Sequence, residues 1–178
     1  SYVKHYETEV SGCGLVERIE HKIDDGIQYE FRIKEVYLPD EQENTGASTD
    51  IKPTMIHKLM TMLIGENKDV STLKLHWHSH AGMGVFHSGT DTDNYETLNN
   101  KDYLVSLVLN KRGDILGSVH MYSPLALDVT GVPVYVDVKV EDTISERVKK
   151  NIEALDKYTS KDKRVYISEY CNNAKLVD

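Results

Sequence analysis

The feature that most constrains this chain is a strand-like segment that ends in three alternating histidines. The strand pattern begins at Val70 and continues into His-Trp-His-Ser-His over residues 76–80. Alternate side chains of a β-strand lie on the same face, about 7 Å apart at ~3.3 Å per residue. We therefore expect His78 and His80 to project together from the strand end, while Trp77 points to the opposite face and packs in the core.

The residues after this strand complete a pattern suited to a metal ion. A loop with two glycines leads to Ser88 and Asp91, and the whole segment reads H-x-H-x7-S-x2-D. Two imidazoles and a carboxylate leave one coordination position of a zinc ion open, as hydrolytic zinc sites require. The spacing therefore predicts one Zn²⁺ per chain, bound by His78, His80 and Asp91. His76 lies on the same strand face and is an alternative ligand.

A structural interpretation of the same residues stays open. Ser88 and Asp91 have nearly the spacing of a capping box, and aspartate is common in the first turn of a helix. A strand end rich in histidine is also compatible with a solvated loop entry. Under this interpretation the segment positions a helix and binds no metal.

At these residues the chain resembles the JAMM (MPN+) metalloprotease family, in particular its short prokaryotic and phage-type members. That family combines H-x-H-x7-S-x2-D with an upstream glutamate in an E-x-x-G setting, which Glu9 to Gly12 match. The resemblance covers roughly residues 5–140 and is specific only at the motif positions. Ala81 departs from the family pattern, because many members have proline at this position.

Glu7 lies on the same strand face as Glu9 by alternation and is the second candidate for the role of Glu9.

The resemblance implies a role for each position of the motif. His78, His80 and Asp91 would be the zinc ligands. Glu9 would act as the general base toward a metal-activated water, and the Ser88 hydroxyl would stabilise the oxyanion. The implied enzyme is a zinc metallopeptidase that hydrolyses peptide or isopeptide bonds, including bonds after a ubiquitin-like C-terminal tail.

The implied partner is a protein or peptide substrate, bound as an extended chain beside a strand edge. The polar segment 40–50 is a candidate wall of that groove. The short chain favours a generic prokaryotic or phage protease over a dedicated deubiquitinase. Two other classes stay open, namely a non-catalytic MPN scaffold or dimerisation module, and a RadC-like member of the superfamily that acts near DNA. A second copy of the chain, in a homodimer, is a further candidate partner.

Composition and charge narrow these classes. The chain has 178 residues and a net charge of −8, and no run of Lys or Arg offers a footprint for nucleic-acid phosphates. No apolar run approaches the ~18 residues of a membrane span, and no signal peptide precedes the first strand pattern. Cys13 and Cys171 lie far apart without a motif, which indicates reduced thiols and a cytoplasmic protein, in a host cytoplasm if the chain is phage-encoded. Neither the P-C-x-x-C of zinc deaminases nor the H-E-x-x-H of zincins is present.

The periodicity predicts one α/β domain over residues 1–178. Alternating apolar residues predict strands, and apolar stripes at helical spacing predict helices. The expected strands cover residues 8–19, 27–38, 70–80, 103–109, 115–122 and 133–140, with a last short strand at 164–168. The expected helices cover residues 52–65, 92–100 and 142–158, and residues 39–50 are expected to form a loop. Together with the resemblance, this order implies a JAMM/MPN fold related to cytidine deaminases, with a mixed, curved sheet flanked by helices.

Three histidines outside the motif carry separate expectations. His87 precedes Ser88 and is a candidate for the entrance of the site. His120 lies in an apolar strand and is expected to be a hydrogen-bonded core histidine. His57 falls off the apolar stripe of its helix and is expected to face solvent.

Overall fold

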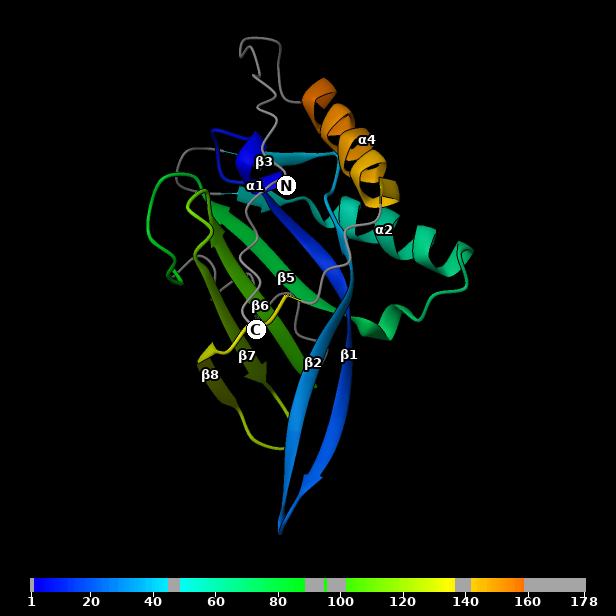
Figure 1. Ribbon diagram of the computed structural model, residues 1–178. Helices are drawn as coiled ribbons and strands as arrows, with labels where there is room; N and C mark the ends of the chain where they lie inside the picture. The colour runs from blue at the N-terminus through cyan, green and yellow to red at the C-terminus, as the bar shows by residue number, and fades with distance from the viewer. Residues whose placement is uncertain (1, 45–48, 89–94, 96–101, 137–141, 159–178) are drawn as a thin grey trace.

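The protein is built on one six-stranded sheet. The computed structural model describes residues 2–44, 49–88, 95, 102–136 and 142–158. The sheet has the strand order β2-β1-β5-β6-β7-β8, and Figure 1 shows the β1–β2 hairpin extending beyond its other strands. Its strands are β1 (Ser11–Ile23), β2 (Gly26–Tyr37), β5 (Leu73–His80), β6 (Tyr103–Asn110), β7 (Ile115–Met121) and β8 (Leu127–Val132). The other elements are α1 (Tyr2–His5), β3 (Gln42–Asn44), β4 (Thr49–Ile51), α2 (Pro53–Gly65), the 3-10 turn η1 (Val70–Thr72) and α4 (Asp142–Tyr158).

The sheet is mixed, as the sequence predicts. β5 and β6 are parallel neighbours, while the other neighbouring strands pair antiparallel. Parallel strands cannot be joined by a tight hairpin and need a longer crossover connection. Residues 81–102 form this connection, which starts at the end of β5 where the histidines lie. The α/β class expected from the sequence is therefore confirmed.

The two faces of β5 differ in polarity. Leu75 and Trp77 belong to the main apolar core, together with Val105 of β6 and Val119 of β7. Leu155 of α4 is fully buried in the same core, so α4 covers this face of the sheet. The histidines of β5 alternate with these residues and therefore project to the opposite face. The predicted burial of Trp77 in the core is confirmed.

The two long helices occupy their predicted ranges. α2 begins at Pro53, whose missing N–H suits the first turn of a helix. Leu63 of α2 is fully buried against Leu15 and Tyr37, whereas His57 is exposed, as its place off the apolar stripe predicts. None of the helices in the described ranges is long and apolar enough to cross a membrane.

Two tight turns join antiparallel strands of the sheet. The turn between β1 and β2 has Asp24 in a left-handed conformation with φ 46°, which aspartate tolerates better than most residues. The turn between β6 and β7 has Gly113 at φ 92°, a backbone conformation that glycine adopts at little cost.

The strand that carries the histidines starts later than the sequence pattern predicts. Residues 70–72 form the 3-10 turn η1, and β5 begins at Leu73. The physical reason is a cap, because the Asp69 carboxylate accepts a hydrogen bond from the Ser71 N–H at 2.9 Å. The prediction of a strand over residues 70–72 is therefore wrong.

The segment expected to be a loop at residues 39–50 contains two short strands. β3 and β4 pair antiparallel as a separate two-stranded sheet. The buried Gln42 side chain ties this sheet to β1, because it accepts from the Ser11 N–H at 2.9 Å and donates to the Ser11 carbonyl at 3.1 Å. Such a tie between a loop side chain and a distant backbone has no signature in the local sequence.

The last strand of the sheet lies before its predicted position. β8 spans Leu127–Val132, and the described part of the predicted strand 133–140 has no regular structure. Pro133 explains the difference, because proline has no N–H to donate to the sheet ladder. Most of the predicted helix at 92–100 and the predicted strand at 164–168 lie outside the described residues.

Cys13 is a buried residue of β1, and its titration gives a test of the core. Burial raises the pKa of its thiol from 9.0 to about 12. Its contribution to stability is therefore fully present below pH 9.0 and is lost as the pH rises toward the folded-state pKa. We predict that the free energy of unfolding falls through this group by up to about 1.4 kcal/mol per pH unit above the unfolded pKa.

Chemical denaturation of the wild type and of Cys13→Ala, below and above pH 9.0, checks this prediction. The stability advantage of the wild type over the variant should narrow as the pH rises, because alanine has no thiol to ionise. An advantage that stays constant across this range would show that the thiol ionises as easily in the folded protein as in the unfolded chain.

Candidate functional site

The side chains of His78 and His80 meet at the end of β5. Their Nε2 atoms lie 3.2 Å apart, and both residues are buried. Two nitrogen ligands at about 2.0–2.1 Å from a tetrahedral zinc ion lie about 3.3 Å from each other. The two histidines therefore have nearly the separation that a shared zinc ion requires, and this pair fits such an ion.

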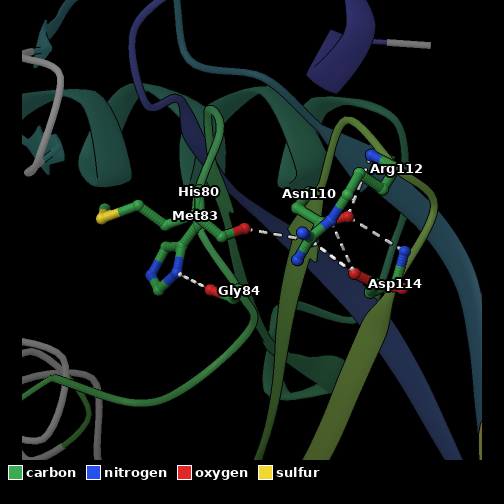
Figure 2. A network of polar contacts seen from close by, with 6 residues as sticks. All are labelled: His80, Met83, Gly84, Asn110, Arg112 and Asp114. Atoms are coloured by element: carbon green, nitrogen blue, oxygen red, sulfur yellow. Dashed lines mark hydrogen bonds and ion pairs between the residues drawn. The ribbon is translucent and has the colours of Figure 1, made fainter.

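The other ring nitrogen of His80 is held by the backbone of the next loop. His80 Nδ1 lies 2.7 Å from the carbonyl oxygen of Gly84, as Figure 2 shows. A carbonyl oxygen only accepts hydrogen bonds, so Nδ1 carries the proton, and in the neutral ring Nε2 carries the lone pair. The His80 Nε2 lone pair then accepts from the His78 Nε2–H in the metal-free protein, and it is the lone pair that would bind a metal ion. An Nδ1–H donated to a backbone carbonyl is typical of metal-binding histidines.

The pairing of β1 with β5 brings Glu9 to the same end of the sheet. The antiparallel register continues just before β1, where the Val10 carbonyl accepts from the Ser79 N–H at 2.8 Å. The Val10 N–H in turn donates to Ser79 Oγ at 3.0 Å. These two hydrogen bonds are the last of the pairing, so Glu9 and His80, the residues next to Val10 and Ser79 in the sequence, lie at the same end of the two strands.

The two candidate glutamates lie in different environments. Only 3% of Glu9 is exposed. Burial of a carboxylate costs free energy, which a structural role alone does not require. The Glu7 side chain is 84% exposed and forms an ion pair with Lys111 at 2.9 Å. Glu9 is therefore the candidate that the fold buries at the end of β5.

The histidine face of the sheet carries a second group of hydrogen-bonded side chains. His87, in the crossover after β5, has Nε2 2.7 Å from Ser118 Oγ and Nδ1 3.0 Å from the Tyr95 hydroxyl. The Tyr95 ring also packs on His120, with 4.6 Å between the ring centroids. These contacts fix the crossover onto the sheet at two points, one on each side of residues 89–94 in the sequence.

His120 is a hydrogen-bonded core histidine, which confirms the prediction. Its Nε2 lies 2.9 Å from Ser106 Oγ, and its Nδ1 lies 2.8 Å from Asp128 Oδ1. This order of acid, imidazole and hydroxyl is also that of a serine-hydrolase triad. Ser106, however, is 0% exposed, so its hydroxyl cannot meet a substrate. The group therefore joins β6, β7 and β8 and has no nucleophilic role.

The remaining residues of the predicted motif are described only in part. The His76 ring lies 5.9 Å from the His78 ring and 5.5 Å from the Tyr95 ring. Ser88 is half-buried in the crossover. Asp91, the third predicted ligand, lies outside the described residues. Among the residues that the structure describes, no three His, Cys, Asp or Glu side chains form a metal-binding group.

Sequence reasoning missed Asn110, which holds the loop after β5. Its Nδ2 donates to the carbonyl of Met83 at 3.0 Å (Figure 2). Asn110 pairs with His80 in the parallel register of β5 and β6. The Asn-x-x-Gly-Asp sequence at residues 110–114 signals the turn between β6 and β7. No sequence pattern indicates that the same asparagine also reaches a carbonyl group in another loop.

Comparison with known proteins does not identify a family for this chain. No protein-family model matches the chain, and no curated protein matches it.

Gly12, the glycine of the E-x-x-G match, allows β1 to approach Trp77 closely. A Cβ atom at this position would lie 2.5 Å from Trp77 Nε1 and would collide with the carbonyl oxygen of Tyr37. We predict that Gly12→Ala lowers the free energy of unfolding by about 1–3 kcal/mol or more, because backbone and a buried indole must both move.

Gly65→Ala is the matched control, because an added Cβ at Gly65 meets no atom within 4 Å. This variant should leave the stability unchanged or raise it by up to about 1 kcal/mol. Chemical denaturation of both variants checks the prediction. Equal stability of the two variants would contradict the close packing at Gly12.

Proposed function

We propose that this protein is a zinc-dependent metallopeptidase of the JAMM (MPN+) type, which hydrolyses peptide or isopeptide bonds. The observation that carries the proposal is the 3.2 Å separation of the Nε2 atoms of His78 and His80 at the buried end of β5. In the metal-free protein the two imidazoles share a hydrogen bond at this distance. Helix capping explains Ser88 and Asp91 but gives no reason for placing two buried imidazoles so that their Nε2 atoms face each other, since burial of polar groups costs free energy. A shared metal ion supplies that reason.

Each residue of the proposed site has its own role in the reaction. His78 and His80 would hold the ion from β5, and Asp91 in the crossover is the proposed third ligand. When bound, zinc supplies Lewis-acid chemistry, which polarises the scissile carbonyl and lowers the pKa of a water molecule. The Glu9 carboxylate accepts a proton from the attacking water and delivers it to the leaving amine. The Ser88 hydroxyl donates a hydrogen bond to the oxyanion that develops on the substrate.

The fold is compatible with a JAMM/MPN domain and supports the proposal in one respect. The proposed base and the proposed ligands come from sequence segments far apart, so only strand pairing can bring them together. The pairing of β1 with β5 extends to Val10 and Ser79, so Glu9 and His80 lie at the same end of a mixed sheet. A base and a metal ligand that act at one site have to share such an end.

The proposed substrate is a protein or peptide with an extended segment, such as a ubiquitin-like C-terminal tail. An extended segment gains affinity from main-chain hydrogen bonds along a strand edge. The β3–β4 sheet is the proposed wall of the groove. Gln42 binds both backbone groups of Ser11, and Thr49 Oγ1 lies 2.9 Å from Ser11 Oγ. Because Ser11 pairs with His78, this small sheet adjoins the part of β1 that lies beside the histidine strand.

The acidic charge of the chain weighs against a RadC-like role near DNA. With a net charge of −8 and no basic run, the protein has no electrostatic footprint for a phosphate backbone. A non-catalytic scaffold is the remaining alternative, and metal binding separates it from the enzyme.

We predict that the purified protein binds about one zinc ion per chain and that His80→Ala abolishes this binding, because a ligand is lost. Metal analysis by mass spectrometry after incubation with zinc and dialysis checks the prediction. His57→Ala is the matched control, because His57 is an exposed histidine of α2, and it should bind zinc as the wild type does. A wild-type protein that takes up no added zinc would contradict the proposal and favour the scaffold.

We further predict that Glu9→Gln keeps its zinc but loses at least about 100-fold in hydrolytic rate, because an amide cannot accept the proton from water. The rate is measured with fluorogenic peptides and with fusions to a ubiquitin-like tail. Glu7→Gln is the control, since Glu7 is exposed and ion-paired with Lys111, and it should retain the wild-type rate. Undiminished hydrolysis by Glu9→Gln would remove Glu9 from the mechanism.

A further inference from the structure

We infer that Asn110 is a positioning residue that sets the tautomer of His80 through the loop that follows β5. The inference rests on the proposed function, in which the Nε2 lone pair of His80 has to be available to the metal ion. Asn110 would not bind the ion. It would act through the backbone of residues 81–84, which lies between its amide group and the His80 ring.

Asn110 ends β6 next to the end of β5. It pairs with His80 in the parallel register and is 4% exposed. Figure 2 shows its side chain between Met83, in the loop after β5, and Asp114, at the end of the turn between β6 and β7. This single side chain therefore joins two loops that leave the sheet at the same edge.

The amide group of Asn110 uses its whole hydrogen-bonding capacity. Its Oδ1 accepts from the N–H groups of Arg112 and Asp114, each at 3.0 Å. Its Nδ2 donates to Asp114 Oδ2 at 2.7 Å and to the Met83 carbonyl at 3.0 Å. An asparagine amide has two N–H donors and two acceptor lone pairs, so these four bonds fill it. Three of them hold the turn, and the bond to Met83 extends to the histidine side.

The bond to Met83 determines where the next carbonyl group lies. Met83 sits between Gly82 and Gly84, and a glycine-rich loop has many accessible conformations unless other groups hold it. Once the Met83 carbonyl is fixed, the adjacent Gly84 carbonyl accepts the His80 Nδ1–H at 2.7 Å. Without the Asn110 donor, the loop loses this restraint, and a neutral His80 ring is free to place its proton on Nε2 instead.

A role of Asn110 in the turn alone makes a different prediction, and two variants separate the roles. Asn110→Asp keeps an acceptor for the turn N–H groups but loses both Nδ2 donors, so it releases Met83. Asp114→Ala is the matched control, because it removes the acceptor on the turn side and leaves the donor to Met83 in place. If Asn110 serves only the turn, neither variant changes the His80 tautomer.

The experiment measures the protonation of each His80 ring nitrogen by NMR of the nitrogen-labelled, metal-free protein, with His80→Gln to assign the signals. Zinc affinity is then measured by competition with a chelator. We expect the proton on Nδ1 in the wild type and in Asp114→Ala. In Asn110→Asp this preference should be lost, and zinc should bind about 10- to 100-fold more weakly. A wild-type proton on Nε2, or a wild-type tautomer and affinity in Asn110→Asp, would overturn the inference.

Two additional measurements keep the result unambiguous. Thermal unfolding of each metal-free variant shows whether it folds, and Asn110→Ser replaces Asn110→Asp if the introduced charge prevents folding. The NMR measurement does not require metal, so it separates this inference from the proposed function. A wild type that binds no zinc, but whose Nδ1–H tautomer depends on Asn110, supports the positioning contact and contradicts only the metallopeptidase.

Discussion

The close approach of β1 to β5 at Gly12 is the constraint on which the candidate site depends. The Trp77 side chain packs where any side chain at Gly12 would collide with it, so the two strands pair in one register. The pairing extends to Val10 and Ser79, which brings Glu9 to the end of β5 that carries His80. A slip of one residue would turn every side chain of one strand to the other face of the sheet. The apolar core and the candidate site therefore share a single packing constraint.

The two faces of β5 are both buried, but one faces apolar side chains and the other faces polar side chains. One face contributes to the apolar core under α4, which supplies the hydrophobic stabilisation of the fold. The other face is lined by buried imidazoles and hydroxyls, and side-chain hydrogen bonds such as those of His87 and His120 offset part of their desolvation. An apolar face would stabilise the fold at lower cost. The proposed metal site would account for the buried polar groups at the end of β5.

Much of the fold could be predicted from the sequence because it depends on local periodicity. The predicted helix 52–65 and strand 27–38 follow from patterns in a few consecutive residues, and α2 and β2 confirm both. The predictions are wrong where one side chain overrides the local pattern. Asp69 converts the start of a strand pattern into a 3-10 turn, and Pro133 ends the sheet before the alternating valines that follow it.

The sequence by itself determined which chemical groups are present and which of them share a strand. The alternation of His78 and His80 against Trp77 follows from the backbone geometry of one strand, so it needs no other part of the chain. Only the tertiary structure decided that Glu9 is buried at this end of β5 while Glu7 is exposed. That choice depends on a pairing between residues 69 positions apart. The register of such a pairing is set by the packing of the whole core, which no local pattern encodes.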